Sequence, residues 1–137
     1  MSKKILCPTD GSEHAMVGVR RATEIARQNG AGLTLCLVNV MLGGGRGPLI
    51  NELEDKDVAR ILDEAVAAAT AAGMTSVERA ELVSRDVAPA IITYADQNGF
   101  DHIVMGTGDK RGVKRLVLGS VAAQVAGQAH CTVTIAR

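Results

Sequence analysis

Short apolar runs recur along the chain at a length that suits β-strands. The first covers residues 4–7 and stops at Pro8. The second covers residues 33–41 and is apolar at both odd and even positions. A run that does not alternate favours a strand covered on both faces, as in a parallel sheet. Three further strands are predicted at residues 77–83, 102–105 and 131–136.

Between these strands, apolar residues repeat every three or four positions, which predicts amphipathic helices. The helices are expected at residues 12–28, 51–72, 86–98 and 120–128, with Asp86 as a candidate cap. Residues 43–48, GGGRGP, are the only low-complexity segment and predict a flexible break. Because strands and helices alternate, we expect one α/β domain over residues 1–137, with a doubly wound parallel sheet and right-handed crossovers.

In a sheet of this kind, ligands bind beyond the carboxyl ends of the strands, where the strand order reverses. The turn at residues 8–12 follows the first predicted strand, and a Gly-rich loop at residues 106–119 follows the fourth. We expect these two segments to meet at the ligand site.

Composition excludes several classes of function. The 137 residues carry 15 basic and 15 acidic side chains, so the chain lacks the basic excess of a general binder of nucleic acids or membrane surfaces. A hydrophobic fraction of 47% argues against disorder, and 1% aromatic residues cannot stack single-stranded bases. We find no signal peptide or membrane span, and three widely spaced cysteines predict reduced core thiols, so we expect a cytoplasmic protein.

The loop at residues 106–119 has the chemistry of a phosphate site. Gly119-Ser120 opens a predicted helix, whose free N–H groups at Ser120 and Val121 attract anions. The loop also holds four cations, Lys110, Arg111, Lys114 and Arg115. The alternative is a solvated turn with scattered surface charge. A nicotinamide-linked oxidoreductase is set aside, because Gly106-x-Gly108 follows the fourth strand rather than the first.

Four segments, in this order and spacing, resemble the universal stress protein family. They are ILCPTDGSE at residues 5–13, IVMG at 103–106, GSVA at 119–122 and HCTVTI at 130–135. The resemblance implies a five-stranded parallel sheet in a flavodoxin-like or adenine-nucleotide α-hydrolase-like three-layer sandwich. It also implies a stress-response protein that binds ATP, AMP or cyclic AMP, with Mg²⁺ left open.

The family's nucleotide motif is a glycine, two residues, a second glycine, nine residues, and then Gly-Ser or Gly-Thr. Placed on this chain it begins at Gly106 and ends at Gly119-Ser120, but Asp109 stands where the second glycine should be. A carboxylate at about 4 Å from a phosphate could cost roughly 4 kcal/mol, enough to abolish binding. Three arrangements would still allow the phosphate to bind: flexibility supplied by Gly108, neutralisation of Asp109 by neighbouring cations, or a divalent cation held by Asp109.

The remaining residues of the expected nucleotide site lie in or after the first two predicted strands. The resemblance implies that Asp10 contacts ribose or adenine and that the backbone of Val38 hydrogen-bonds adenine. A helix-capping role for Asp10 and a plain core role for Val38 remain as alternatives. The expected nucleotide-binding residues are Pro8, Thr9, Asp10, Val38, Met105, Gly106, Gly108, Asp109, Gly119, Ser120, Val121 and Ala122.

Two functions remain in competition. The first is a sensor or regulator that binds an adenine nucleotide and is not an enzyme, since neither the histidines nor Ser12 and Ser120 show a nucleophile paired with a base; slow ATP hydrolysis is not excluded. The second is a dimeric interaction protein that binds no nucleotide. Residues 131–136 alternate valine and isoleucine with threonine and carry no edge-blunting lysine or proline, so we expect a homodimer through this strand.

Overall fold

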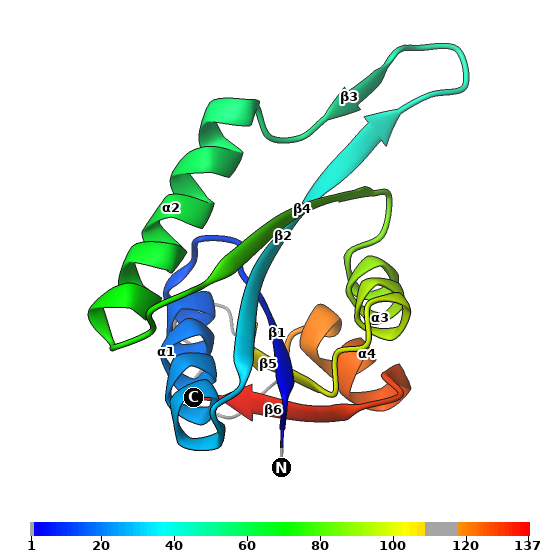
Figure 1. Ribbon diagram of the computed structural model, residues 1–137. Helices are drawn as coiled ribbons and strands as arrows, with labels where there is room; N and C mark the ends of the chain where they lie inside the picture. Colours follow the sequence, from blue (N-terminus) through cyan, green and yellow to red (C-terminus); the bar gives the residue numbers. More distant parts are fainter. Residues whose placement is uncertain (1, 109–117) are drawn as a thin grey trace.

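The computed structural model describes residues 2–108 and 118–137. Within these residues the parallel sheet has five strands in the order β4-β2-β1-β5-β6 (Figure 1). Their bounds are Lys4–Pro8 for β1, Gly32–Gly43 for β2, Glu78–Ser84 for β4, His102–Gly106 for β5 and Thr132–Ala136 for β6. The predicted fold class, a doubly wound α/β domain with a parallel sheet, is confirmed.

Helices cover both faces of the sheet and make three layers. Helices α1 (Glu13–Asn29) and α2 (Asp55–Ala71) pack on one face, and α3 (Val87–Gln97) and α4 (Ser120–Gln128) pack on the other. The strands supply both cores by alternation: Ile5 and Cys7 belong to the first core, whereas Leu6 between them belongs to the second. This two-sided burial explains why β1 and the first part of β2 are apolar at successive positions.

The strand order reverses at β1. From this strand the chain passes first to β2 on one side and later to β5 on the other. A crevice forms at such a switch point, because the connections that leave the two neighbouring strands run in opposite directions. The fold therefore places the turn after β1 and the segment after β5 at one end of the sheet, as expected.

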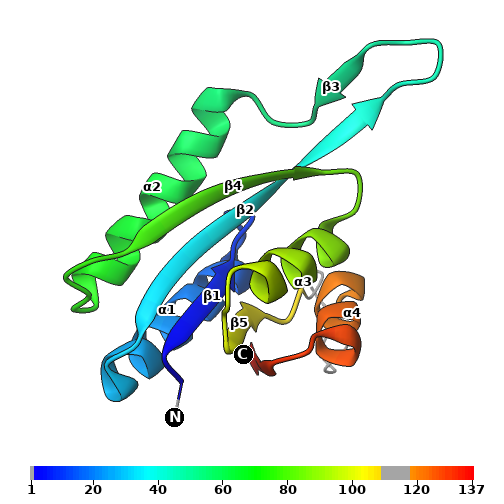
Figure 2. The same ribbon diagram turned by 45° about the vertical axis from the view of Figure 1, so that its right-hand side comes forward.

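A sixth strand, β3 (Leu49–Asn51), is absent from the sequence prediction. It pairs antiparallel with the end of β2, from Met41↔Asn51 to Gly43↔Leu49. The predicted break at residues 43–48 is the tip of this hairpin, where three successive glycines have positive φ. The resulting arm projects beyond the layers (Figures 1 and 2). Three residues after a proline are too short a segment to show strand periodicity.

Two local expectations are also corrected. Helix α2 begins at Asp55, not at residue 51, because β3 and its exit take up residues 49–54. Asp86 stands at the N-cap of α3, but its side chain makes no capping hydrogen bond. Its backbone N–H donates to the Ser84 hydroxyl oxygen at 3.2 Å. No helix within the described ranges is long and apolar enough to cross a membrane.

Candidate functional site

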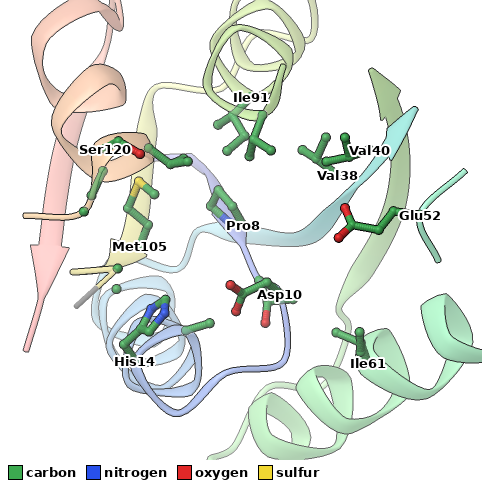
Figure 3. A pocket seen from close by; sticks show the side chains of 18 of the residues that line it. Pro8, Asp10, His14, Val38, Val40, Glu52, Ile61, Ile91, Met105 and Ser120 are labelled. Carbon is green, nitrogen blue, oxygen red and sulfur yellow. The ribbon is translucent and has the colours of Figure 1, made fainter. Parts of the chain in front are cut away.

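A cavity of about 450 Å³ opens beyond the carboxyl ends of β1, β2 and β5 (Figure 3). Eleven of the twelve residues expected from the sequence line it: Pro8, Thr9, Asp10, Val38, Met105, Gly106, Gly108, Gly119, Ser120, Val121 and Ala122. The twelfth, Asp109, lies outside the described residues, as do the four loop cations at positions 110–115. The structure thus brings the described members of the set together, while their role as nucleotide ligands stays a prediction.

Strand β2 presents a short length of unpaired backbone to this cavity. Its pairing with β1 ends at Pro8↔Cys36, and the Thr9 N–H donates to the Cys36 carbonyl at 2.8 Å. Further along, the Val40 carbonyl accepts the Glu52 N–H, also at 2.8 Å. Alternate residues of a strand turn their polar groups to the same edge, so the N–H and C=O of Val38 point into the gap between these two bonds. In the described residues, no strand lies opposite them.

Asp10 is fixed by the turn that connects β1 to α1. Its Oδ1 accepts hydrogen bonds from both the N–H, at 2.9 Å, and the hydroxyl of Ser12. The cap of α1 is Ser12, whose Oγ accepts from the Ala15 N–H at 3.3 Å, so Asp10 supports the cap rather than forming it. Within the described chain, Oδ2 of Asp10 has no hydrogen-bond partner. This oxygen remains free to accept from a ligand hydroxyl.

His14 also lines the cavity, and it lies 2.9 Å from the Ser12 hydroxyl through Nε2. The sequence pattern did not reveal this contact, which forms because Ser12 is the N-cap that precedes α1 and His14 lies in the first turn of the helix. The contact does not make Ser12 a nucleophile. The Ser12 hydroxyl donates its one proton to Asp10 Oδ1, so in this arrangement that proton is not directed at His14.

The amino end of α4 forms the opposite wall. Gly119 is the N-cap and offers no side chain, so the first N–H groups of the helix are not capped by one. Ser120 and Val121 begin the helix beside the cavity. Free N–H groups and the helix dipole together favour a bound anion here. The Ser120 hydroxyl adds a further donor.

The glycines around the motif are explained first by packing. A Cβ on Gly106 would lie 2.0 Å from the carbonyl oxygen of His14, and one on Gly18 would lie 2.6 Å from the Gly106 nitrogen. Similarly, a Cβ on Gly119 would lie 2.6 Å from the carbonyl oxygen of Gly108. The two segments are held together here by the Gly119 N–H, which donates to the Thr107 carbonyl at 2.8 Å. Backbone here approaches backbone, so these glycines are needed before any ligand arrives.

Sequence reasoning missed the apolar half of the cavity. Val40, Ile61, Val87 and Ile91 contribute side chains from β2, α2 and α3. Val40 could have been found, since it lies two residues after Val38 and so on the same face of β2. Glu52 gave no signal, because its place depends on the unpredicted strand β3.

The lining has two distinct ends (Figure 3). Ser120, Met105 and His14 lie on one side, Val40, Glu52 and Ile61 lie on the other, and Asp10 lies between them. One end therefore combines a helix amino terminus with polar groups, and the other is a mainly apolar slot. This arrangement suits an elongated ligand with a flat apolar part and an anionic part.

Comparison with known proteins gives consistent matches over the whole chain. The model of the universal stress protein family matches residues 1–137. A universal stress protein of Methanocaldococcus jannaschii is 32% identical, over 98% of this chain and 82% of its own. The structure of a universal stress protein in complex with cAMP is 30% identical, with a TM-score of 0.76 and coverage of 99% and 97%. A protein of Archaeoglobus fulgidus in complex with dAMP is 26% identical, with a TM-score of 0.70 and coverage of 100% and 98%.

Proposed function

The chain belongs to the universal stress protein family, and we propose that it binds an adenine nucleotide in the cavity beyond β1, β2 and β5. The observation that carries this proposal is the polarity of the cavity: an apolar slot at one end, a helix amino terminus at the other, and a carboxylate between them. A volume of about 450 Å³ lies in the usual range for small-molecule sites. Relatives described as complexes with cAMP and dAMP support an adenine ligand.

The base would occupy the apolar slot. Adenine presents a ring nitrogen that accepts and an amino group that donates, side by side. The Val38 N–H and C=O, unpaired in the gap of β2, offer the complementary pair of groups. Val40, Ile61 and Ile91 would bury the faces of the ring.

The remainder of the nucleotide would extend towards α4. Oδ2 of Asp10 can accept from a ribose hydroxyl, and the first turn of α4 can hold a phosphate through Ser120 and Val121. In the described residues, no group of three or more His, Cys, Asp or Glu side chains could hold a metal ion. A Mg²⁺ ion that accompanies the nucleotide would be held by phosphate oxygens, with Asp109 as the candidate carboxylate from the loop.

The role that follows is that of a sensor or regulator whose occupancy reports a nucleotide. The Ser12 hydroxyl is engaged by Asp10, which supports binding without covalent catalysis, and slow ATP hydrolysis would require Asp10, His14 or Glu52 of the lining to activate a water. The three buried or half-buried cysteines, all free, support a reducing compartment such as the cytoplasm.

A nucleotide-independent interaction protein remains the second candidate, because Asp109 replaces a motif glycine. We propose a homodimer through residues 131–136 in either case. Strand β6 pairs with β5 on one side, and within the described chain its other edge is unpaired. Two copies of this edge would cover each other around a two-fold axis.

Thermal unfolding with and without ligand tests the proposed function. At 100 times its Kd, a nucleotide that binds only the folded chain adds about 2.7 kcal/mol of stability, a rise in Tm of roughly 5–10 °C. We expect this rise with at least one of ATP, AMP and cyclic AMP, and none with ribose 5-phosphate, which lacks the base. If none of the three raises Tm, the interaction-protein candidate is favoured.

The variant Asp109→Gly tests the departure from the family motif. Removal of the charge and the Cβ is expected to strengthen ATP binding by about tenfold or more, on the Coulomb estimate for a carboxylate near a phosphate. Titration calorimetry of both proteins measures the change. Weaker binding by the variant would instead assign Asp109 to a cation.

A further inference from the structure

Glu52 enters the cavity at the end away from α4. It follows β3, and its N–H is held by the Val40 carbonyl at 2.8 Å. Its carboxylate points into the cavity beside Val38 and Val40 (Figure 3). Glu52 is an exposed residue at the mouth of this end, and within the described chain its carboxylate has no hydrogen-bond or ion-pair partner. An acceptor is thus presented where the slot is otherwise suited to a flat ring.

The position of Glu52 is set by the core as well as by the pairing of β3 with β2. Asn39 is fully buried, and its side-chain amide makes two hydrogen bonds to Leu53, the residue that follows Glu52. Nδ2 donates to the Leu53 carbonyl at 3.0 Å, and Oδ1 accepts from the Leu53 N–H at 2.9 Å. The same Nδ2 donates to Glu81 on β4 at 3.0 Å. Glu52 is therefore anchored at its own backbone and at the following residue, so its carboxylate has a defined origin.

The gap in β2 places Glu52 next to the backbone that would recognise a base. The Val38 groups lie between the Thr9–Cys36 bond on one side and the Glu52–Val40 bond on the other. A purine amino group has two hydrogens. If the Val38 carbonyl accepts one, the second points along the edge of the ring, towards the side on which Glu52 lies.

We infer that Glu52 is a specificity-determining residue that selects purines with a 6-amino group. Its carboxylate accepts the second hydrogen of that group. A 6-oxo purine, such as hypoxanthine or guanine, would instead turn a carbonyl oxygen towards the carboxylate, and two acceptors cannot pair. This inference rests on the proposed function, because it requires a base in the slot.

A charge effect without recognition would look different. A carboxylate at the mouth of a site repels every nucleotide through its phosphates, whatever the base. Its removal would then raise the affinity for adenine and hypoxanthine nucleotides by the same factor. Direct recognition changes the ratio of the two affinities, so the ratio is the quantity to measure.

The experiment is titration calorimetry with the matched pairs AMP/IMP and ATP/ITP, whose members differ at position 6 of the purine and in the hydrogen that hypoxanthine carries on N1. The wild-type chain is expected to prefer the adenine member by at least about tenfold, the usual size of a hydrogen bond to a charged group. The Val38 backbone groups also favour adenine, so the contribution of Glu52 is the change in this preference in the variant. Glu52→Gln should lower this preference by about ten- to a hundredfold, since an amide can donate to a 6-oxo group as well as accept from an amino group.

Glu54→Gln is the control, because it removes an equal charge two residues away, from an exposed side chain paired with Lys56 and absent from the cavity lining. It should leave the preference unchanged. A preference that is the same in the wild type and in Glu52→Gln, with the adenine nucleotides bound, overturns the inference alone. Failure of the wild type to bind any of the four nucleotides overturns the proposed function and the inference together. Circular dichroism and an unchanged Tm without ligand verify that Glu52→Gln is folded.

Discussion

Substitution of Gly106 by alanine tests whether the motif glycine serves the fold before it serves a ligand. The added Cβ would lie 2.0 Å from the carbonyl oxygen of His14 and 2.5 Å from its carbonyl carbon. Ordinary van der Waals contact begins near 3.4 Å. Both obstructing atoms belong to the backbone of α1, and neither can rotate away. The whole helix must therefore shift from β5, or the strand must bend.

Overpacking of a well-filled interior usually costs about 1–3 kcal/mol. The obstacle here is backbone, so we expect the upper part of that range, about 3 kcal/mol. With a urea m-value of about 2 kcal/mol/M, the unfolding midpoint falls by roughly 1.5 M. Urea unfolding followed by circular dichroism, without nucleotide, measures this directly.

Gly127→Ala is the matched control. It makes the same chemical change within α4, where a new Cβ would meet nothing within 4 Å, so better helix propensity should raise stability by about 0.5 kcal/mol. The two glycines should thus respond with opposite signs. If Gly106→Ala unfolds at the wild-type midpoint, the packing explanation is wrong, and the glycine is kept for the ligand alone.

Three other predictions concern stability, reactivity and assembly. Burial raises the pKa of Cys36 to about 12 and that of Cys7 higher still, so we expect at most one of the three thiols to react with a disulfide reagent at pH 8 before denaturant is added, as absorbance would show. Burial lowers the pKa of His102, against an opposing effect of Asp101. Because the unfolded chain then binds a proton more readily, the free energy of unfolding should be greatest above about pH 6.5 and should decrease as the pH falls through that value. In His102→Gln this decrease should be smaller, as urea titrations from pH 8 to pH 5 would report. Val133→Lys, on the outer strand β6, should convert the proposed homodimer to monomers in light scattering at micromolar concentration, and a folded variant that stays dimeric would contradict that interface.

Sequence alone predicted the elements whose patterns are local. Helix α4 begins and ends where the glycine, the serine and the apolar spacing place it, and the buried strands were recognised because both of their faces are apolar. Strand β3 could not be predicted in this way. Its three residues are exposed and gain their strand character only from pairing with the end of β2.

The residues of the candidate site also fall into those marked by local sequence patterns and those placed by long-range packing. Asp10 and Ser120 were identifiable because turn and helix-start chemistry marks them in the sequence. Ile91 looked like an ordinary helix residue, and it lines the cavity only because α3 packs over β2. Glu52 required knowledge of both β3 and the Asn39 amide that fixes Leu53. Long-range packing, rather than local propensity, decides such positions.

The Asn39 amide also divides the arm into two parts with different freedom to change. The glycine-rich tip at residues 43–48 contributes no residue to the cavity lining. The chain that returns from the tip is held at Leu53 by the two hydrogen bonds of the Asn39 amide. Insertions at the tip would lengthen the arm without moving Glu52. Related chains can thus acquire new tips, and new neighbours, under selection separate from that on the ligand. For an engineer, the tip is a graft point: a peptide tag or recognition loop placed there would be displayed away from the body while the cavity keeps its shape.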